Sequence, residues 1–178
     1  LFEALPKHLK QMALFTVNTG CRDAEVCNLR WDWEVQVPQL KTSVFIIPSE
    51  HVKNGDERLI VLNDVAKGVV EEQRGLSNTY VFPYQDRPVQ RMLNGAWLRA
   101  RKSVDLEMVR VHDLKHTFGR RLRAAGVSFE DRQDLLGHRS GRITTHYSAA
   151  ELTSLIEAAN KVCSKSDKPD LVVMRRLR

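Results

Sequence analysis

Residues 112–118 read His-Asp-Leu-Lys-His-Thr-Phe, and this stretch decides how the rest of the chain is interpreted. Leu-Gly-His follows at residues 136–138 and Thr-His-Tyr at residues 145–147, so that four of the six histidines lie between residues 112 and 146. Histidine, lysine and tyrosine side chains can together hold a phosphate, move protons around it and attack it without a metal ion. The pattern therefore predicts phosphoryl transfer.

The other groups that such a reaction needs lie in the N-terminal half. Arg22 stands between two predicted helices, and its guanidinium can bind two phosphate oxygens without losing its charge. Lys53 precedes Asn-Gly, a pair that favours a tight hairpin turn. His112 and Lys115 are three residues apart on one helix face and can bracket the same phosphate. Tyr147 needs a base or nearby cations to attack, because the unperturbed pKa of tyrosine is roughly 10.

Taken in order, these motifs resemble the catalytic domain of the tyrosine recombinases, the phage integrase family, over residues from about 10 to 150. The resemblance implies cleavage and rejoining of double-stranded DNA through a 3′-phosphotyrosine intermediate, with no metal, other cofactor or ATP. It also implies the catalytic roles: phosphate clamps at Arg22 and Lys115, an acid for the departing 5′ oxygen at Lys53, proton transfer at His112, a phosphate hydrogen-bond donor at His138 and the nucleophile at Tyr147. Glu25 and His116 resemble supporting residues that orient these groups.

One position departs from the family pattern. Family members have arginine three residues after the first histidine of this motif, whereas this chain has Lys115. A lysine keeps the positive charge but loses the two-pronged contact of a guanidinium. The main alternative hypothesis is therefore a weakened or inactive recombinase domain that binds DNA without cutting it.

A remote alternative is a zinc hydrolase. His112 and His116 are four residues apart on one helix face, with Asp113 where zinc peptidases have glutamate. Aspartate is a shorter base, the sequence indicates no third ligand, and the neighbouring cations would repel a metal ion. We therefore expect no metal site.

The charge of the chain favours a polyanionic partner. It has 28 lysines and arginines against 22 acidic residues, a net charge of +6. Four arginines follow the histidine motifs and are predicted to contact the DNA backbone: Arg120, Arg121, Arg123 and Arg139. The predicted partners are double-stranded DNA and, by the resemblance, further recombinase protomers that form a tetramer in the synaptic complex.

Composition also predicts a cellular compartment. The three cysteines have no paired spacing, which argues against a disulfide framework and for reducing conditions. No apolar run reaches the roughly 20 residues that a membrane span requires. We therefore expect a cytoplasmic protein with no membrane partner.

The hydrophobic pattern predicts one α+β domain, mostly α-helical with a small three-stranded antiparallel sheet within residues 33–62. Helices are expected to end before Gly20, to begin again after a cap at Asp23 and at residue 64, and to cover residues 93–103, 112–125, 128–137 and 151–163. We expect residues 1–163 to form the catalytic domain and residues 164–178 a tail, in which residues 171–174 add a strand to a neighbouring protomer. The N-terminal core-binding domain of the family is expected to be absent from this chain.

Overall fold

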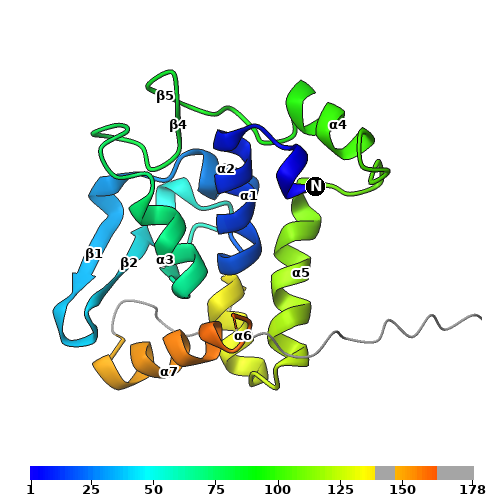
Figure 1. The fold of residues 1–178 in the computed structure, drawn as a ribbon. Helices are drawn as coiled ribbons and strands as arrows, with labels where there is room; N and C mark the ends of the chain where they lie inside the picture. The colour runs from blue at the N-terminus through cyan, green and yellow to red at the C-terminus, as the bar shows by residue number, and fades with distance from the viewer. Residues whose placement is uncertain (139–146, 164–178) are drawn as a thin grey trace, which may run out of the picture.

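The computed structural model describes residues 1–138 and 147–163 (Figure 1). Its α-helices pack around a three-stranded antiparallel sheet, which confirms the predicted α+β class. The predictions for Arg139 and for residues 171–174 fall outside the described residues. The α-helices are α1 (Lys7–Thr19), α2 (Asp23–Cys27), α3 (Asp64–Glu71), α4 (Gly95–Lys102), α5 (Val111–Ala124), α6 (Phe129–Leu136) and α7 (Ala149–Asn160).

Helix α1 is the central element and packs against both α3 and α5 (Figure 1). It starts directly after Pro6 and ends at Gly20, whose φ of 67° is the left-handed conformation that terminates helices. A Cβ atom on Gly20 would lie 2.8 Å from side-chain atoms of both Leu136 and Phe118. Glycine is therefore required here twice, for its backbone angle and for its size, and the predicted stop before Arg22 is confirmed.

The sheet consists of β1 (Glu34–Val37), β2 (Thr42–Ile47) and β3 (Arg58–Val61), in the order β1-β2-β3. Both pairings are antiparallel, as predicted. The connection between β2 and β3 spans residues 48–57 and contains the 3₁₀ turn η4 (Ser49–His51). The expected tight Asn-Gly hairpin is therefore wrong: of that pair Gly55 adopts a positive φ, 74°, and its N–H closes a turn on the carbonyl of Val52 at 2.9 Å.

Helix boundaries follow capping chemistry more closely than apolar spacing. Helix α6 starts as predicted, because Ser128 accepts a hydrogen bond from the backbone N–H of Asp131 at 3.0 Å. Helix α7 starts two residues before the predicted Glu151, because Ser148 and Glu151 form a reciprocal capping box. The predicted cap at Asp23 is wrong, since Arg22 occupies the N-cap position of α2.

A short hairpin of β4 (Pro83–Tyr84) and β5 (Arg87–Pro88) was not predicted, because two-residue strands leave no alternating pattern. The hydrophobic interior divides into two clusters of buried side chains. The first includes Phe15 of α1 and Trp97 of α4, and the second joins β3, α5, α6 and α7 through residues such as Phe118. None of the described helices is long and apolar enough to cross a membrane.

Candidate active site

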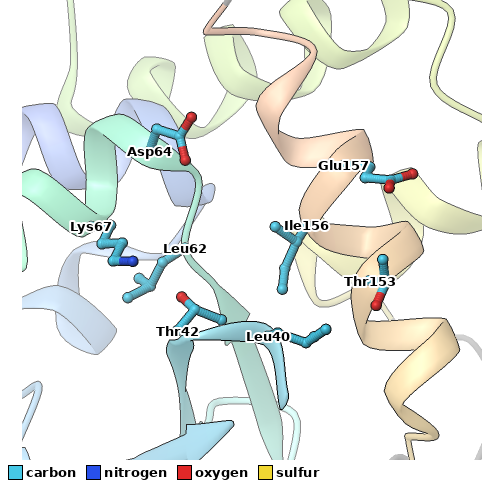
Figure 2. A pocket seen from close by; sticks show the side chains of 8 residues that line it. All are labelled: Leu40, Thr42, Leu62, Asp64, Lys67, Thr153, Ile156 and Glu157. Atoms are coloured by element: carbon cyan, nitrogen blue, oxygen red, sulfur yellow. The ribbon is translucent and has the colours of Figure 1, made fainter. Parts of the chain in front are cut away.

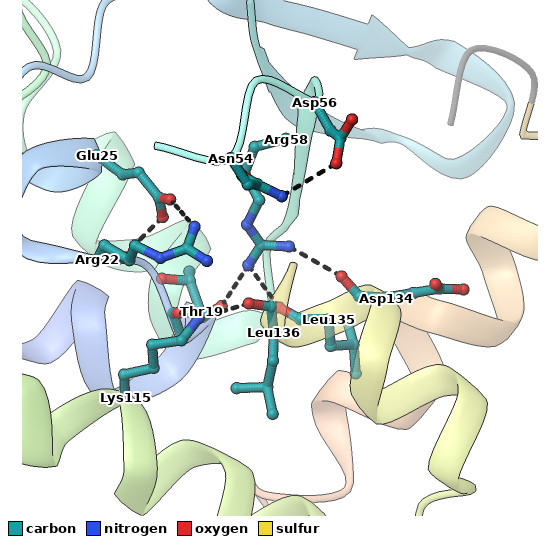
Figure 3. Close-up of polar contacts among 11 residues, drawn as sticks. Thr19, Arg22, Glu25, Asn54, Asp56, Arg58, Lys115, Asp134, Leu135 and Leu136 are labelled. Atoms are coloured by element: carbon teal, nitrogen blue, oxygen red, sulfur yellow. Dashed lines mark hydrogen bonds and ion pairs between the residues drawn. The ribbon is translucent and has the colours of Figure 1, made fainter. Parts of the chain in front are cut away.

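The C-terminal ends of α1 and α6 meet at one point, and two buried cations lie between them (Figure 3). The last carbonyls of a helix have no partner within the helix and carry the negative end of its dipole. Here those carbonyls face the side chains of Arg58, from β3, and Lys115, from α5. We call this arrangement the carbonyl junction: Arg58 and Lys115 with the backbone carbonyls of Thr19, Gly20, Asp134, Leu135 and Leu136.

Lys115 joins the two helices through its ammonium group. The Nζ atom donates to the carbonyl of Gly20 at 2.7 Å and to the carbonyl of Leu136 at 2.5 Å. The residue is 5% exposed. Burial, and then the charge of Arg58, lowers the pKa of Lys115 to about 8. Two of the three donors of the predicted phosphate clamp are thus committed to the backbone.

Arg58 was missed in the sequence because arginine is seldom buried and because it only opens an apolar run. It is 2% exposed. One terminal nitrogen, Nη1, donates to the carbonyl of Asp134 at 2.8 Å, and Nη2 donates to the carbonyls of Leu135 at 2.6 Å and Thr19 at 3.4 Å. These bonds link residues far apart in the sequence, so no local pattern could have predicted them.

Arg22 lies two residues after Gly20 of this junction and is held by Glu25, as Figure 3 shows. Its Nη1 lies 2.6 Å from Oε1 of Glu25, while its backbone N–H donates to Oε2 at 2.7 Å. Glu25 is buried, but the side chain of Arg22 remains 27% exposed. Burial alone would raise the pKa of Glu25, but Arg58 and the two bonds from Arg22 together lower it. The charged carboxylate can therefore orient an arginine that still reaches solvent.

His138 lies two residues after Leu136, the last junction residue of α6. It is exposed, and its backbone N–H donates to the carbonyl of Gln133 at 3.0 Å. Partial burial and then the charges of Lys115 and Arg22 lower the pKa of His138. The ring is therefore mostly neutral near pH 7, when it can donate one hydrogen bond.

The structure explains why glycine stands at the centre of the Leu-Gly-His motif. The φ of Gly137 is 59°, the left-handed conformation that ends α6. A Cβ atom at this position would lie 2.5 Å from Cδ and Nε of Arg58 and 2.7 Å from Cζ. The glycine thus leaves room for the buried guanidinium.

His112 and His116 lie together on the exposed side of α5. Their ring centroids are 4.5 Å apart and their planes meet at 84°. Burial, followed by the charges of His116 and Lys115, lowers the pKa of His112. A neutral imidazole at this position can accept a proton.

The two remaining catalytic candidates lie on other segments. Lys53 is exposed in the β2–β3 connection, five residues before Arg58. Tyr147 lies directly before Ser148, the N-cap of α7, and packs half-buried against the second core cluster. The structure therefore groups Arg22, Glu25 and Lys115 with the histidines and places Lys53 and Tyr147 on the β2–β3 connection and before α7.

The predicted DNA-contacting arginines differ in their surroundings. Arg120 and Arg123 are exposed on α5. Arg121 is partly buried, and its guanidinium donates to the carbonyls of Val17 at 3.3 Å and Val162 at 2.6 Å. Arg121 thus ties α5 to α1 and to the residues that follow α7, while contact with DNA stays a prediction for all of them.

The structure also bears on two other kinds of site, a metal centre and a cavity. Within residues 1–138 and 147–163, no three His, Cys, Asp or Glu side chains are grouped as ligands of a metal ion. A cavity of about 270 Å³ lies between α7 on one side and β2 and α3 on the other, and Figure 2 shows the side chains around it. It is lined by Leu40, Thr42, Leu62, Asp64, Lys67, Thr153, Ile156 and Glu157, none of them a candidate site residue.

Comparison of the sequence with known proteins identifies a family. A model of the phage integrase family matches residues 2–153. The chain is 29% identical to the integrase of Salmonella phage P22, in an alignment that covers 92% of this chain and 45% of that protein. It is 27% identical to a XerC-like tyrosine recombinase of Caldanaerobacter subterraneus, over 89% of this chain and 51% of that protein. The chain thus spans about half the length of these relatives.

Comparison with solved structures supports the fold. The integrase of transposon Tn1549 in complex with circular intermediate DNA matches with a TM-score of 0.54 and 17% identity, over 83% of this chain and 57% of that chain. The XerH site-specific recombinase bound to its difH substrate matches with a TM-score of 0.55 and 20% identity, over 85% of this chain and 49% of that chain. The helices and sheet described above therefore form the fold of recombinase catalytic domains.

Proposed function

The chain belongs to the phage integrase family, and on that basis we propose that it cleaves and rejoins double-stranded DNA at specific sites through Tyr147. The observation that carries the proposal is the grouping of Arg22, Lys115 and His138 where α1 and α6 end. A partly exposed guanidinium, a buried ammonium and a neutral imidazole at one point suit the oxygens of a single phosphodiester.

In the proposed reaction, the hydroxyl oxygen of Tyr147 attacks phosphorus and forms a new phosphorus–oxygen bond. The bond from phosphorus to the 5′ oxygen of the DNA breaks at the same centre. The tyrosine proton passes to His112, and Lys53 supplies a proton to the departing 5′ oxygen. Arg22 and His138 stabilise the negative charge on the non-bridging oxygens, where donors fixed in advance are most effective.

Rejoining follows by the reverse path. A 5′ hydroxyl attacks the phosphotyrosine, returns a proton to Lys53 and releases the tyrosine oxygen, which recovers its proton from His112. The covalent intermediate retains the phosphodiester bond energy, so the proposed cycle uses neither ATP nor a metal ion. The proposal includes a tetramer of protomers on paired sites and action in the cytoplasm, where DNA is accessible.

A second candidate function is DNA binding without cleavage. The observation that favours it is the ammonium of Lys115, which already donates to the carbonyls of Gly20 and Leu136. Less of its hydrogen-bonding capacity is left for a phosphate than a guanidinium would offer at this position. In this case Arg22, with the exposed arginines of α5, would hold the DNA backbone while the chemical step fails.

Incubation with a nicked DNA substrate that carries the native site, followed by a denaturing gel, tests the proposal. The wild-type chain is expected to form a covalent protein–DNA band, and Tyr147→Phe is expected to bind DNA with unchanged affinity but to form none. An adduct with the phenylalanine variant would contradict the assignment of the nucleophile. Binding without an adduct in the wild type would favour the second candidate.

A further inference from the structure

We propose that Arg58 is a positioning residue of the candidate active site, which sets the place of Arg22 relative to His138 by holding the ends of α1 and α6 together. Its consequence for catalysis rests on the proposed function. Arg58 acts through the backbone, because its bonds go to carbonyls of both helices.

Two helix C-termini at close range need a cation between them. Each C-terminus carries a partial negative charge and carbonyls without helical partners, so two of them at close range repel each other. Arg58 supplies a charge that complements both ends and donates to the carbonyls of Thr19 on α1 and Asp134 and Leu135 on α6. Its 2% exposure keeps these bonds away from competing water.

The carbonyls that Arg58 binds lie close in the chain to two candidate site residues. Its acceptor on α1, Thr19, is three residues before Arg22, and its acceptor Leu135 is three residues before His138. Lys115 forms a second bridge one residue further along both helices, at Gly20 and Leu136. Two bridges in succession define both the distance and the relative rotation of the two helix ends.

The surroundings of Arg58 leave room for its guanidinium and satisfy both terminal nitrogens, while the buried Nε has no partner among the described residues. Gly137 provides the space, since a Cβ atom there would come within 2.5 Å of Cδ and Nε. Glu25 provides a nearby negative charge: burial raises the pKa of its carboxyl, and Arg58 is the foremost of the groups that lower it. Arg58 therefore acts electrostatically on the residue that orients Arg22 and lies against Gly137, the residue that precedes His138.

Arg58→Lys is the most informative variant, because it keeps the charge but has one donor nitrogen where Arg58 uses two. Single-turnover cleavage of a nicked substrate is expected to slow by roughly 100-fold, the cost of a misplacement of about 1 Å at a catalytic group. DNA affinity is expected to stay nearly unchanged. Arg74→Met is the matched control: Arg74 forms ion pairs with Glu34 at 2.7 Å and Glu71 at 2.9 Å, on β1 and α3, which carry no candidate site residue.

A double-mutant cycle separates positioning from loss of stability. If Arg58 acts by placing His138, Arg58→Lys should slow a His138→Gln background by less than about threefold, because the group that it positions is already gone. An equal slowing in both backgrounds, or a full cleavage rate in Arg58→Lys alone, would overturn the proposal.

A second readout does not depend on cleavage. Titration of the His138 ring by NMR in the 178-residue chain should give a higher pKa in Arg58→Lys than in the wild type, because the ring loses its place beside Lys115 and Arg22 while the charge at residue 58 is kept. An unchanged His138 titration would overturn the proposal even if the rate falls. A wild-type chain that forms no adduct would instead contradict the proposed function, and the titration would still decide whether Arg58 positions His138.

Discussion

The carbonyl junction and the β2–β3 connection adjoin each other in the chain, yet they differ in almost every physical respect. In the junction, Arg58 and Lys115 are buried and make five hydrogen bonds to backbone carbonyls. In the connection, Lys53 is exposed, and a Cβ atom added to Gly55 would meet nothing within 4 Å. The difference predicts that the carbonyl junction is already formed in the free protein, whereas Lys53 takes its place only when DNA binds.

Matched glycine substitutions should separate the two regions most strongly. Gly137→Ala combines a left-handed backbone, which costs about 1–2 kcal/mol, with a clash against a buried guanidinium, which costs about 1–3 kcal/mol. We expect urea denaturation to show a loss of about 3 kcal/mol in the free energy of unfolding. Gly55→Ala has the same kind of backbone but open space and should lose only about 1–2 kcal/mol. Equal losses would mean that the junction is no more tightly packed than the connection.

Lys53→Met should show the opposite pattern, with little effect on stability and a large one on rate. An exposed side chain contributes within about 0.5 kcal/mol to the free energy of unfolding, but loss of a general acid slows cleavage by roughly 100-fold. The measurement is single-turnover cleavage of two substrates, one normal and one with sulfur in place of the bridging 5′ oxygen. Sulfur leaves without a proton, so it should restore the rate of the variant. Failure of the sulfur substrate to do so would remove Lys53 from the role of acid.

Lys115→Arg sharpens the comparison within the junction. A guanidinium has five donors, so it can satisfy the carbonyls of Gly20 and Leu136 and still offer a pair to the phosphate. We expect single-turnover cleavage to accelerate about tenfold, which corresponds to about 1.4 kcal/mol of the barrier, while DNA affinity changes little. Identical rates would show that Lys115 binds only the backbone carbonyls. The loss in the free energy of unfolding of Lys115→Met, which cannot donate to either carbonyl, would then measure how much those two bonds stabilise the junction.

The sequence predicted those parts of the site that depend on local chemistry. Gly20 and Gly137 end helices α1 and α6, and Ser128 caps the start of α6. Arg22 follows the first glycine and His138 the second, as the motif spacing indicated. Their roles in catalysis stay predictions. The sheet was predictable too, because its apolar strands are bounded by turn residues.

What the sequence could not predict depends on contacts between distant segments. The acceptors of Arg58 on α6 lie more than 70 residues along the chain, at separations of 76 and 77, and the acceptor of Lys115 on α1 lies 95 residues away. Nothing local distinguishes such a buried cation from an exposed one. Arg22 at the N-cap was missed for a different, local reason: arginine is not a capping residue by type, and it serves here through its backbone N–H and its pairing with Glu25, three residues along the chain.

Hydrogen–deuterium exchange of the 178-residue chain, with and without DNA that carries the native site, tests the contrast between the two regions most directly. Without DNA, amides at the end of α6, such as that of His138, which bonds to Gln133, should already exchange slowly, while the amides of residues 53, 54, 56 and 57 in the connection exchange fast. With DNA, protection should rise in residues 53–57 and change little at the end of α6. Fast exchange at the end of α6 in the free protein, or equal gains in both regions on binding, would contradict the account of a preformed carbonyl junction.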